Sequence, residues 1–241
     1  MKDKRSEIVV AVAGQPNSGK STIFNLLTGA RQHVANYPGV TVEKRWGKYS
    51  HDGNTVTLVD LPGTYSLTSY SQEERIARDF LLHEKPAAVL DIVDASNLER
   101  NLYLTFQLQE IGIPIVVALN MVDVAQARGL VIDPQKLSEL LQASVVATVG
   151  NKGKGKEELK AAILSTCKNS EKGGFRIDYG EKMESILDSL EKKLSENGNI
   201  SSSYPLRWLA VKLMENDREA RRLVEKMASE QKELGGTLMP M

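Results

Sequence analysis

One eight-residue segment near the start of the chain holds the residue types with the clearest chemistry. Residues 14–21 read Gly-Gln-Pro-Asn-Ser-Gly-Lys-Ser, which fits the pattern GxxxxGK[ST]. Loops with this pattern surround a phosphate with backbone N–H groups, while the lysine reaches the β- and γ-phosphates and the final hydroxyl binds magnesium. The helix that begins near Lys20 adds N–H groups and the positive end of its dipole. The predicted phosphate-binding residues are Gly14, Gln15, Pro16, Asn17, Ser18, Gly19, Lys20, Ser21 and Thr22.

A glycine-containing turn could match the same pattern by chance, so the flanking elements matter. Apolar residues fill positions 8–13 and read as a buried strand, and a helical pattern follows from Lys20. Strand, loop and helix in this order are the context in which the pattern binds phosphate. The segment therefore predicts a phosphate site.

A second candidate group follows the strand-like residues 54–59. Asp60-Leu61-Pro62-Gly63 places a carboxylate where it can hold magnesium through water, and the backbone N–H of Gly63 can turn toward a γ-phosphate. Asp-x-x-Gly is also a common turn sequence, so alone it says little. Its position at the end of a buried strand makes it a candidate partner of the phosphate loop.

The choice of base rests on Asn120-Met121-Val122-Asp123, directly after the apolar run 115–119. A carboxylate at Asp123 can accept hydrogen bonds from N1–H and the 2-amino group of guanine, a donor pair that adenine lacks. A site built for those donors rejects a ligand without them by about 10⁴ to 10⁵. Asn120 is expected to buttress the base and the phosphate loop. A polar loop after a buried strand is the alternative, but three motifs in this order favour a guanine nucleotide.

The elements that must position these groups alternate along the chain. Apolar or β-rich runs alternate with helical patterns, which predicts an α/β fold with a mostly parallel six-stranded sheet flanked by helices. Asp52-Gly53 lies between two β-rich runs and indicates a hairpin, so one edge of the sheet is expected to be antiparallel. The predicted strands are 7–13, 41–50, 54–59, 87–93, 113–119 and 144–149, and the predicted helices are 20–28, 72–83, 98–111, 134–142 and 156–168.

The sequence changes character after Cys167. Residues 168–174 are polar and end in two glycines, which is typical of a linker. We expect a first domain at 1–170 and an all-helical unit at 171–241. The first helix of this unit is expected to end near Asn197, and two more are expected at 205–215 and 217–231. Residues 235–241 read as a frayed end or as the start of a connection to something longer. The apolar face expected on the first of these helices comprises Met183, Ile186, Leu187, Leu190 and Leu194.

Composition limits the classes of function. The 31 basic residues balance the 31 acidic residues, so no electrostatic reason favours nucleic acid as a partner. Cys167 is the only cysteine, which excludes an internal disulfide and fits a reducing compartment. No apolar run approaches the roughly 20 residues of a membrane-spanning helix.

Four segments give the chain a resemblance to a known family. Residues 14–29, 36–43, 60–67 and 94–104 are similar to the cytosolic G domain of FeoB-type bacterial ferrous iron transporters. The similarity covers about residues 7–168, and the helical unit matches that family in position and size. The resemblance implies a P-loop GTPase fold followed by a helical domain that links to a membrane region.

The resemblance also implies roles for the first switch. Gly39, Val40 and Thr41 would contact the nucleotide, and Thr41 would complete the coordination of magnesium by Ser21 and Asp60. Asn17, with backbone carbonyls near Ala35 and Tyr37, would bind potassium and so supply charge that an arginine finger supplies elsewhere. Read alone, Asn17 would be a turn residue and Thr41 a strand residue. The residues expected to act in catalysis are Asn17, Lys20, Thr41 and Gly63.

Three positions depart from common GTPase patterns. Thr64 stands where Ras-like enzymes carry the glutamine that orients water, so slow hydrolysis is expected. Met121 replaces a frequent lysine, which should weaken binding. The loop over the guanine is expected at Val149, Gly150, Asn151 and Lys152, where Gly150 should make it flexible.

These features predict a magnesium-dependent GTPase, activated by potassium, that regulates ferrous iron uptake. Its partners would be GTP or GDP and the transporter's own transmembrane domain, with a homo-oligomer as a further option. No nucleic acid is expected as a partner. The resemblance places the whole protein at the cytoplasmic face of the bacterial inner membrane, with this part soluble. A nucleotide-sensing interaction module and a soluble ribosome-associated GTPase are the alternatives.

Overall fold

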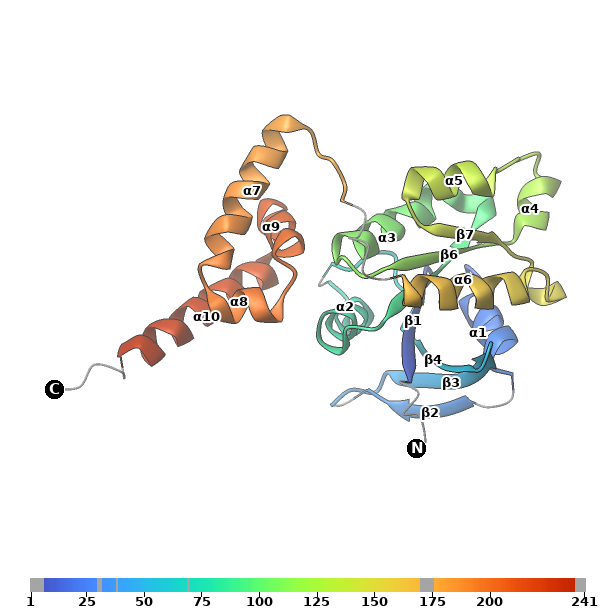
Figure 1. The fold of residues 1–241 in the computed structure, drawn as a ribbon, viewed down its shortest axis with the longest axis horizontal. Coiled ribbons are helices and arrows are strands. Elements are labelled where there is room, and N and C mark those ends of the chain that lie inside the picture. Colours follow the sequence, from blue (N-terminus) through green and yellow to red (C-terminus); the bar gives the residue numbers. More distant parts are fainter. Residues whose placement is uncertain (1–6, 30–31, 38, 69, 170–175, 237–241) are drawn as a thin grey trace. The chain divides into compact units, whose positions relative to one another are not determined.

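The computed structural model describes residues 7–29, 32–37, 39–68, 70–169 and 176–236 (Figure 1). Contacts divide the chain into two compact units. The first contains the described residues up to Gln109 and those from Ile113 to 169, and the second contains Glu110–Gly112 and the residues from Arg176 onward. The predicted boundary at 170/171, most of the predicted linker and positions 237–241 lie outside the described residues.

A seven-stranded sheet in the order β2-β3-β4-β1-β5-β6-β7 forms the centre of the first unit. β1 pairs in parallel with both β4 and β5, and the parallel ladder continues through β6 to β7. β3 is antiparallel to both β2 and β4. The expected antiparallel edge is therefore confirmed. The strands are β1 Ile8–Gly14, β2 Gln32–Asn36, β3 Glu43–His51, β4 Asn54–Asp60, β5 Ala88–Asp94, β6 Ile115–Asn120 and β7 Ser144–Ala147.

The sheet has one strand more than the six expected from the sequence. β2 has no alternation of apolar and polar residues, because four of its five side chains are exposed at the edge of the sheet. Its pairing with β3 stabilises it instead, and the rings of His33 and Trp46 stack across the pair at 5.3 Å. The strand predicted from Thr41 begins only at Glu43.

Helices cover both faces of this sheet, as the α/β pattern predicted (Figure 1). The ends of α1 and α6 fall where the sequence placed them, whereas the short helix α4 was not predicted. The elements are α1 Lys20–Thr28, α2 Gln72–Glu84, η1 Ala95–Asn97, α3 Leu98–Glu110, α4 Val122–Ala127, α5 Pro134–Leu141, η2 Gly150–Lys152 and α6 Lys156–Lys168.

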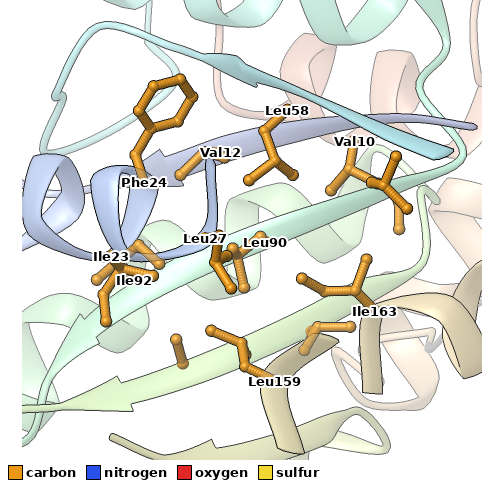
Figure 2. Close-up of a cluster of buried hydrophobic side chains, with 14 of the residues drawn as sticks. Val10, Val12, Ile23, Phe24, Leu27, Leu58, Leu90, Ile92, Leu159 and Ile163 are labelled. Carbon is orange, nitrogen blue, oxygen red and sulfur yellow. The ribbon is translucent and has the colours of Figure 1, made fainter. Parts of the chain in front are cut away.

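Alternate residues of the central strands form the main core beneath α1 and α6 (Figure 2). Val10 and Val12 of β1 and Leu90 and Ile92 of β5 point to this face, because side chains two positions apart in a strand lie on the same side. The opposite face of β5 carries Asp91, whose carboxylate accepts a 2.6 Å hydrogen bond from the Thr105 hydroxyl of α3. The helix side chains that complete the core are Ile23, Phe24, Leu27, Leu159 and Ile163.

The second unit is helical, as predicted. Leu187 and Leu194 of its first helix are buried, but Ile186, expected on the same face, is 44% exposed because it lies at the margin of the apolar stripe. Asn197, where a helix was expected to stop, also begins a short new one by capping the N–H groups of Asn199 and Ile200. The helices are α7 Glu181–Ser195, α8 Gly198–Ser203, α9 Leu206–Met214 and α10 Arg218–Gly236.

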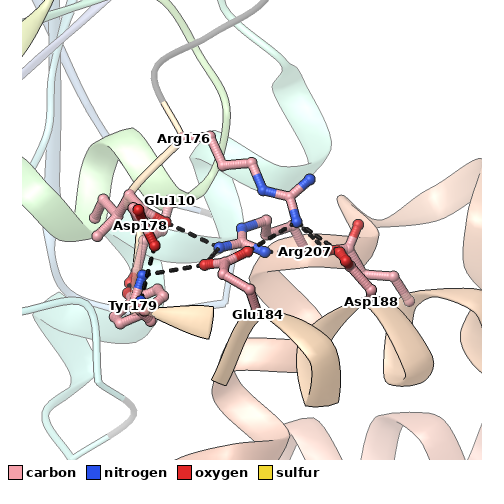
Figure 3. Close-up of polar contacts among 10 residues, drawn as sticks. Glu110, Arg176, Asp178, Tyr179, Glu184, Asp188 and Arg207 are labelled. Atoms are coloured by element: carbon pink, nitrogen blue, oxygen red, sulfur yellow. Dashed lines mark hydrogen bonds and ion pairs between the residues drawn. The ribbon is translucent and has the colours of Figure 1, made fainter. Parts of the chain in front are cut away.

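Ion pairs hold α7 against α9 inside this unit (Figure 3). The Arg207 guanidinium of α9 donates to Glu184 of α7 at 2.7 Å and to the backbone carbonyl of Ile177 at 2.9 Å. Arg176 donates to Glu184 at 3.0 Å and to Asp188 at 2.7 Å. Glu184 thus joins both arginines, and this network supplements a small apolar core.

Candidate nucleotide-binding site

The phosphate loop follows β1, the central strand of the seven-stranded sheet. Ligands of such sheets bind beyond the carboxyl ends of the strands, where the strand order reverses. Asn17 has a φ of 67°, so the loop turns through the left-handed region that asparagine tolerates. Pro16 and Asn17 are exposed at the tip, while Gln15 and Ser18 are buried beneath it.

Gly19 caps α1 with a φ of 89°, and a Cβ there would lie 2.2 Å from the Asn120 side-chain nitrogen. No other residue fits this conformation and this approach without displacing Asn120. The N-terminus of α1, with exposed Ser21 and Thr22 in its first turn, therefore opens beside the loop.

Lys20 and Asp60 meet at this edge of the sheet. Asp60 ends β4 opposite Val12 of β1, and its carboxylate lies 2.5 Å from the Lys20 ammonium. Burial raises the pKa of Asp60, and Lys20 opposes that shift. Gly63 lies against the same loop, since a Cβ there would be 3.6 Å from the Pro16 Cα. The structure thus brings together the two motifs that the sequence predicted to share a phosphate and a metal.

Asn120 ties the base-recognition motif to the phosphate loop. It is 2% exposed, and its amide nitrogen donates to the Ser18 carbonyl at 3.0 Å. Its side-chain oxygen accepts from the Thr148 hydroxyl at 3.2 Å and from the Gly150 N–H at 3.1 Å. One buried amide therefore connects the phosphate loop, the Asp123 motif and the loop at Gly150.

Asp123 lies in the first turn of α4, which follows Met121 in a left-handed conformation (φ 59°). One carboxylate oxygen accepts from the Val124 N–H at 3.1 Å, and the other accepts from the Lys152 ammonium at 2.8 Å. The bond to Lys152 holds the pKa of Asp123 below its usual range. The carboxylate is ionised at neutral pH and can accept two hydrogen bonds from a guanine edge.

The loop over the predicted base position is more constrained than the sequence suggested. Val149 is buried and forms an isolated bridge with Lys154, while Asn151 and Lys152 are exposed. A Cβ on Gly150 would lie 2.9 Å from the Ile23 side chain, so glycine allows this loop to approach α1 closely. Gly150 has a packing role here, whereas the sequence suggested only flexibility.

The first switch occupies the antiparallel edge of the sheet. Ala35 lies in β2 opposite Lys44 and is exposed. Gly39 and Thr41 are also exposed, and Val40 is half-buried. Tyr37 is buried instead, and its hydroxyl donates to the backbone carbonyl of Asp60 at 3.3 Å. Burial and the neighbouring Asp60 charge raise the pKa of Tyr37, so the hydroxyl keeps its proton.

The sequence did not identify the residues that hold the segment from Gly63 to Leu67, which we call the second switch. The Gln15 amide donates to the Arg100 carbonyl at 2.6 Å, and the Arg100 guanidinium lies 4.4 Å from the centre of the Tyr65 ring. Gln107 accepts from the Leu67 N–H at 2.6 Å, which anchors the segment after Gly63 on α3. Residues 94–104, which include Arg100, are one of the segments that resemble FeoB-type G domains. This resemblance is the sequence feature that points to Arg100. Thr64, where Ras-like enzymes have glutamine, is 5% exposed.

Comparisons with known proteins give a consistent result. The family described as Ferrous iron transport protein B matches residues 8–163, and the FeoB cytosolic helical domain matches residues 179–237. A Fe(2+) transport protein A/Fe(2+) transporter FeoB fusion protein from Porphyromonas gingivalis is 44% identical over 220 residues, or 90% of this chain and 26% of that protein. The chain spans about a quarter of the length of the curated relatives it matches.

Solved structures agree with the sequence comparisons. The cytosolic domain of the T. maritima FeoB iron transporter in GDP form II matches with a TM-score of 0.86 and 38% identity, over 92% of this chain and 87% of that one. Its GMPPNP form gives 0.82 and 39%, over 91% and 86%. Within the described ranges, every helix is too short or too polar to cross a bilayer. The chain belongs to the FeoB family and carries both the G domain and the cytosolic helical domain of that family.

Proposed function

We propose that this chain binds GTP through its G domain and hydrolyses it slowly to GDP and phosphate. The observation that carries the proposal is the buried Asn120 amide, which joins the phosphate loop, the Asp123 motif and the loop at Gly150 in one hydrogen-bonded unit. Such a unit fixes the distance between a phosphate site and a base site. The GDP and GMPPNP forms of the T. maritima relative support a guanine nucleotide as the ligand.

In this proposal the residues keep the roles that their positions favour. The loop N–H groups from Gly14 to Thr22 bind the phosphates, and Lys20 exchanges its bond to Asp60 for the β- and γ-phosphates. Asp123 accepts the guanine N1–H and 2-amino group, while Val149, Gly150 and Asn151 cover the base beside Met121. Gly63 donates its N–H to the γ-phosphate, and Gly39 and Val40 close over the nucleotide.

The donors near the loop fit a magnesium ion. Asp60 is a buried carboxylate beside the first turn of α1, where the Ser21 hydroxyl lies, and hard oxygen donors are those that magnesium prefers. Thr41 would join them after the first switch moves, because its side chain is exposed at the sheet edge. Magnesium would neutralise charge that develops on the phosphate oxygens.

Potassium activation is a finer part of the proposal. Asn17 is exposed at the tip of the phosphate loop, where its side-chain oxygen is available to a cation. The carbonyls of Ala35 and Tyr37 belong to the segment that pairs with β3, so they would join Asn17 only when that segment rearranges. A monovalent cation there would stabilise negative charge on the bridging oxygen.

Hydrolysis then proceeds without a glutamine at position 64. Thr64 is buried, so backbone groups of the switches would place the attacking water, and turnover would stay near the slow intrinsic rates of unassisted GTPases, about 10⁻⁴ to 10⁻³ s⁻¹ without potassium. Loss of the γ-phosphate releases the contacts of Thr41 and Gly63, which relaxes both switches.

We further propose that nucleotide state is passed through the helical domain to a membrane region that takes up ferrous iron. Membership in the FeoB family supports this role, and the matched part of this chain covers 28% of the relatives named as Fe(2+) transporter FeoB. A nucleotide-sensing module with incidental hydrolysis is the second candidate, favoured by the buried position of Thr64.

Phosphate release in potassium and in sodium buffers tests the enzyme against the sensor. We expect potassium to raise turnover of the 241-residue chain by about tenfold or more, and Asn17→Ala to remove the difference between the two cations while GDP still binds. Equal and negligible phosphate release in both buffers would favour the sensor. Equal, fast release by parent and variant would keep the GTPase and reject the potassium site.

A further inference from the structure

Lys152 lies in direct contact with the carboxylate that the proposed function assigns to guanine. Its ammonium is 2.8 Å from Asp123 Oδ2, and the two side chains are 66% and 33% exposed. Asp123 Oδ1 accepts from the Val124 N–H. Each oxygen of this carboxylate therefore has a protein donor, and a guanine edge that binds both oxygens would meet the Lys152 ammonium at Oδ2.

The loop that carries Lys152 holds it in this position. The Lys152 N–H donates to the Val149 carbonyl at 2.9 Å, and the Val149–Lys154 bridge closes the loop behind it. Gly150 is tied to Asn120, so the loop and the Asp123 motif share one buried anchor. The backbone of Lys152 is therefore held at a fixed position within reach of the Asp123 carboxylate.

An ammonium and a guanine edge make the same demand on Asp123, because both are hydrogen-bond donors to ionised oxygen. When guanine leaves, a nearby ammonium can replace it without leaving the carboxylate unpaired. When guanine arrives, the same ammonium must be displaced. A donor built into the protein thus lowers affinity and speeds exchange.

We propose that Lys152, in the loop over the base, competes with guanine for Asp123 and so accelerates the release of bound nucleotide. This inference rests on the proposed function, since it requires guanine to bind Asp123. It gives Lys152 a role opposite to that of a residue that clamps the base. Because the pair is partly exposed, its loss is expected to change affinity by about two- to fivefold, the range of a surface ion pair.

The test is the binding and release of a fluorescent GDP analogue by the full chain in stopped-flow experiments. Lys152→Ala should slow dissociation and tighten binding two- to fivefold, whereas Lys152→Arg, which keeps the ion pair, should behave as the parent. Lys154→Ala is the matched control, because Lys154 is exposed two residues later and its loss changes the net charge equally. A parent-like melting temperature for each variant confirms folding.

Weaker binding by Lys152→Ala, or rates equal to those of the parent, would overturn the inference. Asp123→Ala separates this failure from failure of the proposed function. If Asp123→Ala loses GDP while Lys152→Ala does not tighten it, guanine recognition stands and the role of Lys152 is rejected. If Asp123→Ala binds GDP as tightly as the parent, both are rejected.

Discussion

The two sides of the candidate site differ in how completely the protein holds them. On the base side, Asn120 is buried and makes three hydrogen bonds that join the phosphate loop to the loop at Gly150. On the switch side, Ala35 is exposed on the edge strand β2 and Thr41 is exposed in the turn between β2 and β3. Tyr37 is buried there, but its side chain makes one long hydrogen bond, to the Asp60 carbonyl at 3.3 Å. Under the proposed function, this contrast corresponds to a preformed site for the base and an adjustable one for the γ-phosphate.

This difference has a physical reason. A base is present in both GTP and GDP, so a rigid base site loses little by being preorganised. The γ-phosphate is present in only one of them, and a switch that reports it must have two positions of similar free energy. Weak contacts at the sheet edge satisfy that requirement, and a buried network of amide hydrogen bonds would not.

The largest expected effect comes from removing the base-side anchor. Asn120→Ala leaves buried partners at Ser18, Thr148 and Gly150 without hydrogen bonds, which should cost about 3 kcal/mol and weaken GDP binding by more than about 100-fold. Calorimetric titration with GDP and a thermal melt measure both effects. Thr41→Ala is the control from the switch side and should leave GDP affinity within about twofold. Similar losses of GDP affinity in Asn120→Ala and Thr41→Ala would contradict the difference between the base side and the switch side.

A smaller effect is expected from Asp91, the buried carboxyl on the α3 face of β5. Burial raises the pKa of Asp91 to about 6, and the Thr105 hydroxyl opposes the shift only in part. The folded state therefore binds this proton more tightly than the unfolded state. The stabilisation is full below about pH 4 and is lost as pH rises through 6, by about 2 to 3 kcal/mol.

Asp91→Asn tests this linkage, because an amide mimics the protonated carboxyl at every pH. The variant should match the parent in urea unfolding at about pH 3 and exceed it by about 2 to 3 kcal/mol at pH 8. Asp91→Ala, which leaves a cavity and leaves the Thr105 hydroxyl only its 3.5 Å bond to the Asn101 carbonyl, should destabilise at both values. A constant difference between Asp91→Asn and parent across this range would show that Asp91 does not titrate as described.

The smallest effect is expected on the switch side. Tyr37→Phe removes the hydroxyl that donates to the Asp60 carbonyl at 3.3 Å, a bond long enough to contribute only about 0.5 to 1 kcal/mol. Freed from this contact, the first switch should bind a non-hydrolysable GTP analogue two- to fivefold more tightly, with GDP affinity unchanged. An equal change for both nucleotides would place Tyr37 in the preformed half of the site.

The sequence predicted the preformed half better than the adjustable one. Asn120 and Asp123 could be assigned because buried parallel strands carry them to one edge of the sheet, and the local pattern identifies those strands. The edge strand β2 could not be predicted, since its polar residues gain their stability from β3 and not from their own pattern. The helix α8 could not be predicted either, because its segment is rich in serine. Asn197, where a helix was expected to end, is also the N-cap of α8.

Hydrogen bonds and ion pairs between distant segments also could not be predicted from the sequence. The Lys152 ion pair joins positions 29 residues apart, and the bond from Gln15 to Arg100 joins positions 85 apart. Charged and polar side chains have many potential partners in an unfolded chain, and only the packed sheet edge selects one. The motif at 94–104 marked the region, but not the carbonyl that Gln15 uses.

The most direct test of the account is competition between GDP and ADP for the site, measured by displacement of a fluorescent GDP analogue from the full chain. Asp123 and the preformed loops predict that ADP requires a concentration at least about 10³-fold higher than GDP, because adenine leaves the Asp123 carboxylate without its two donors. Displacement by ADP and GDP at similar concentrations would contradict guanine recognition, and with it the proposal that this half of the site is built for the base.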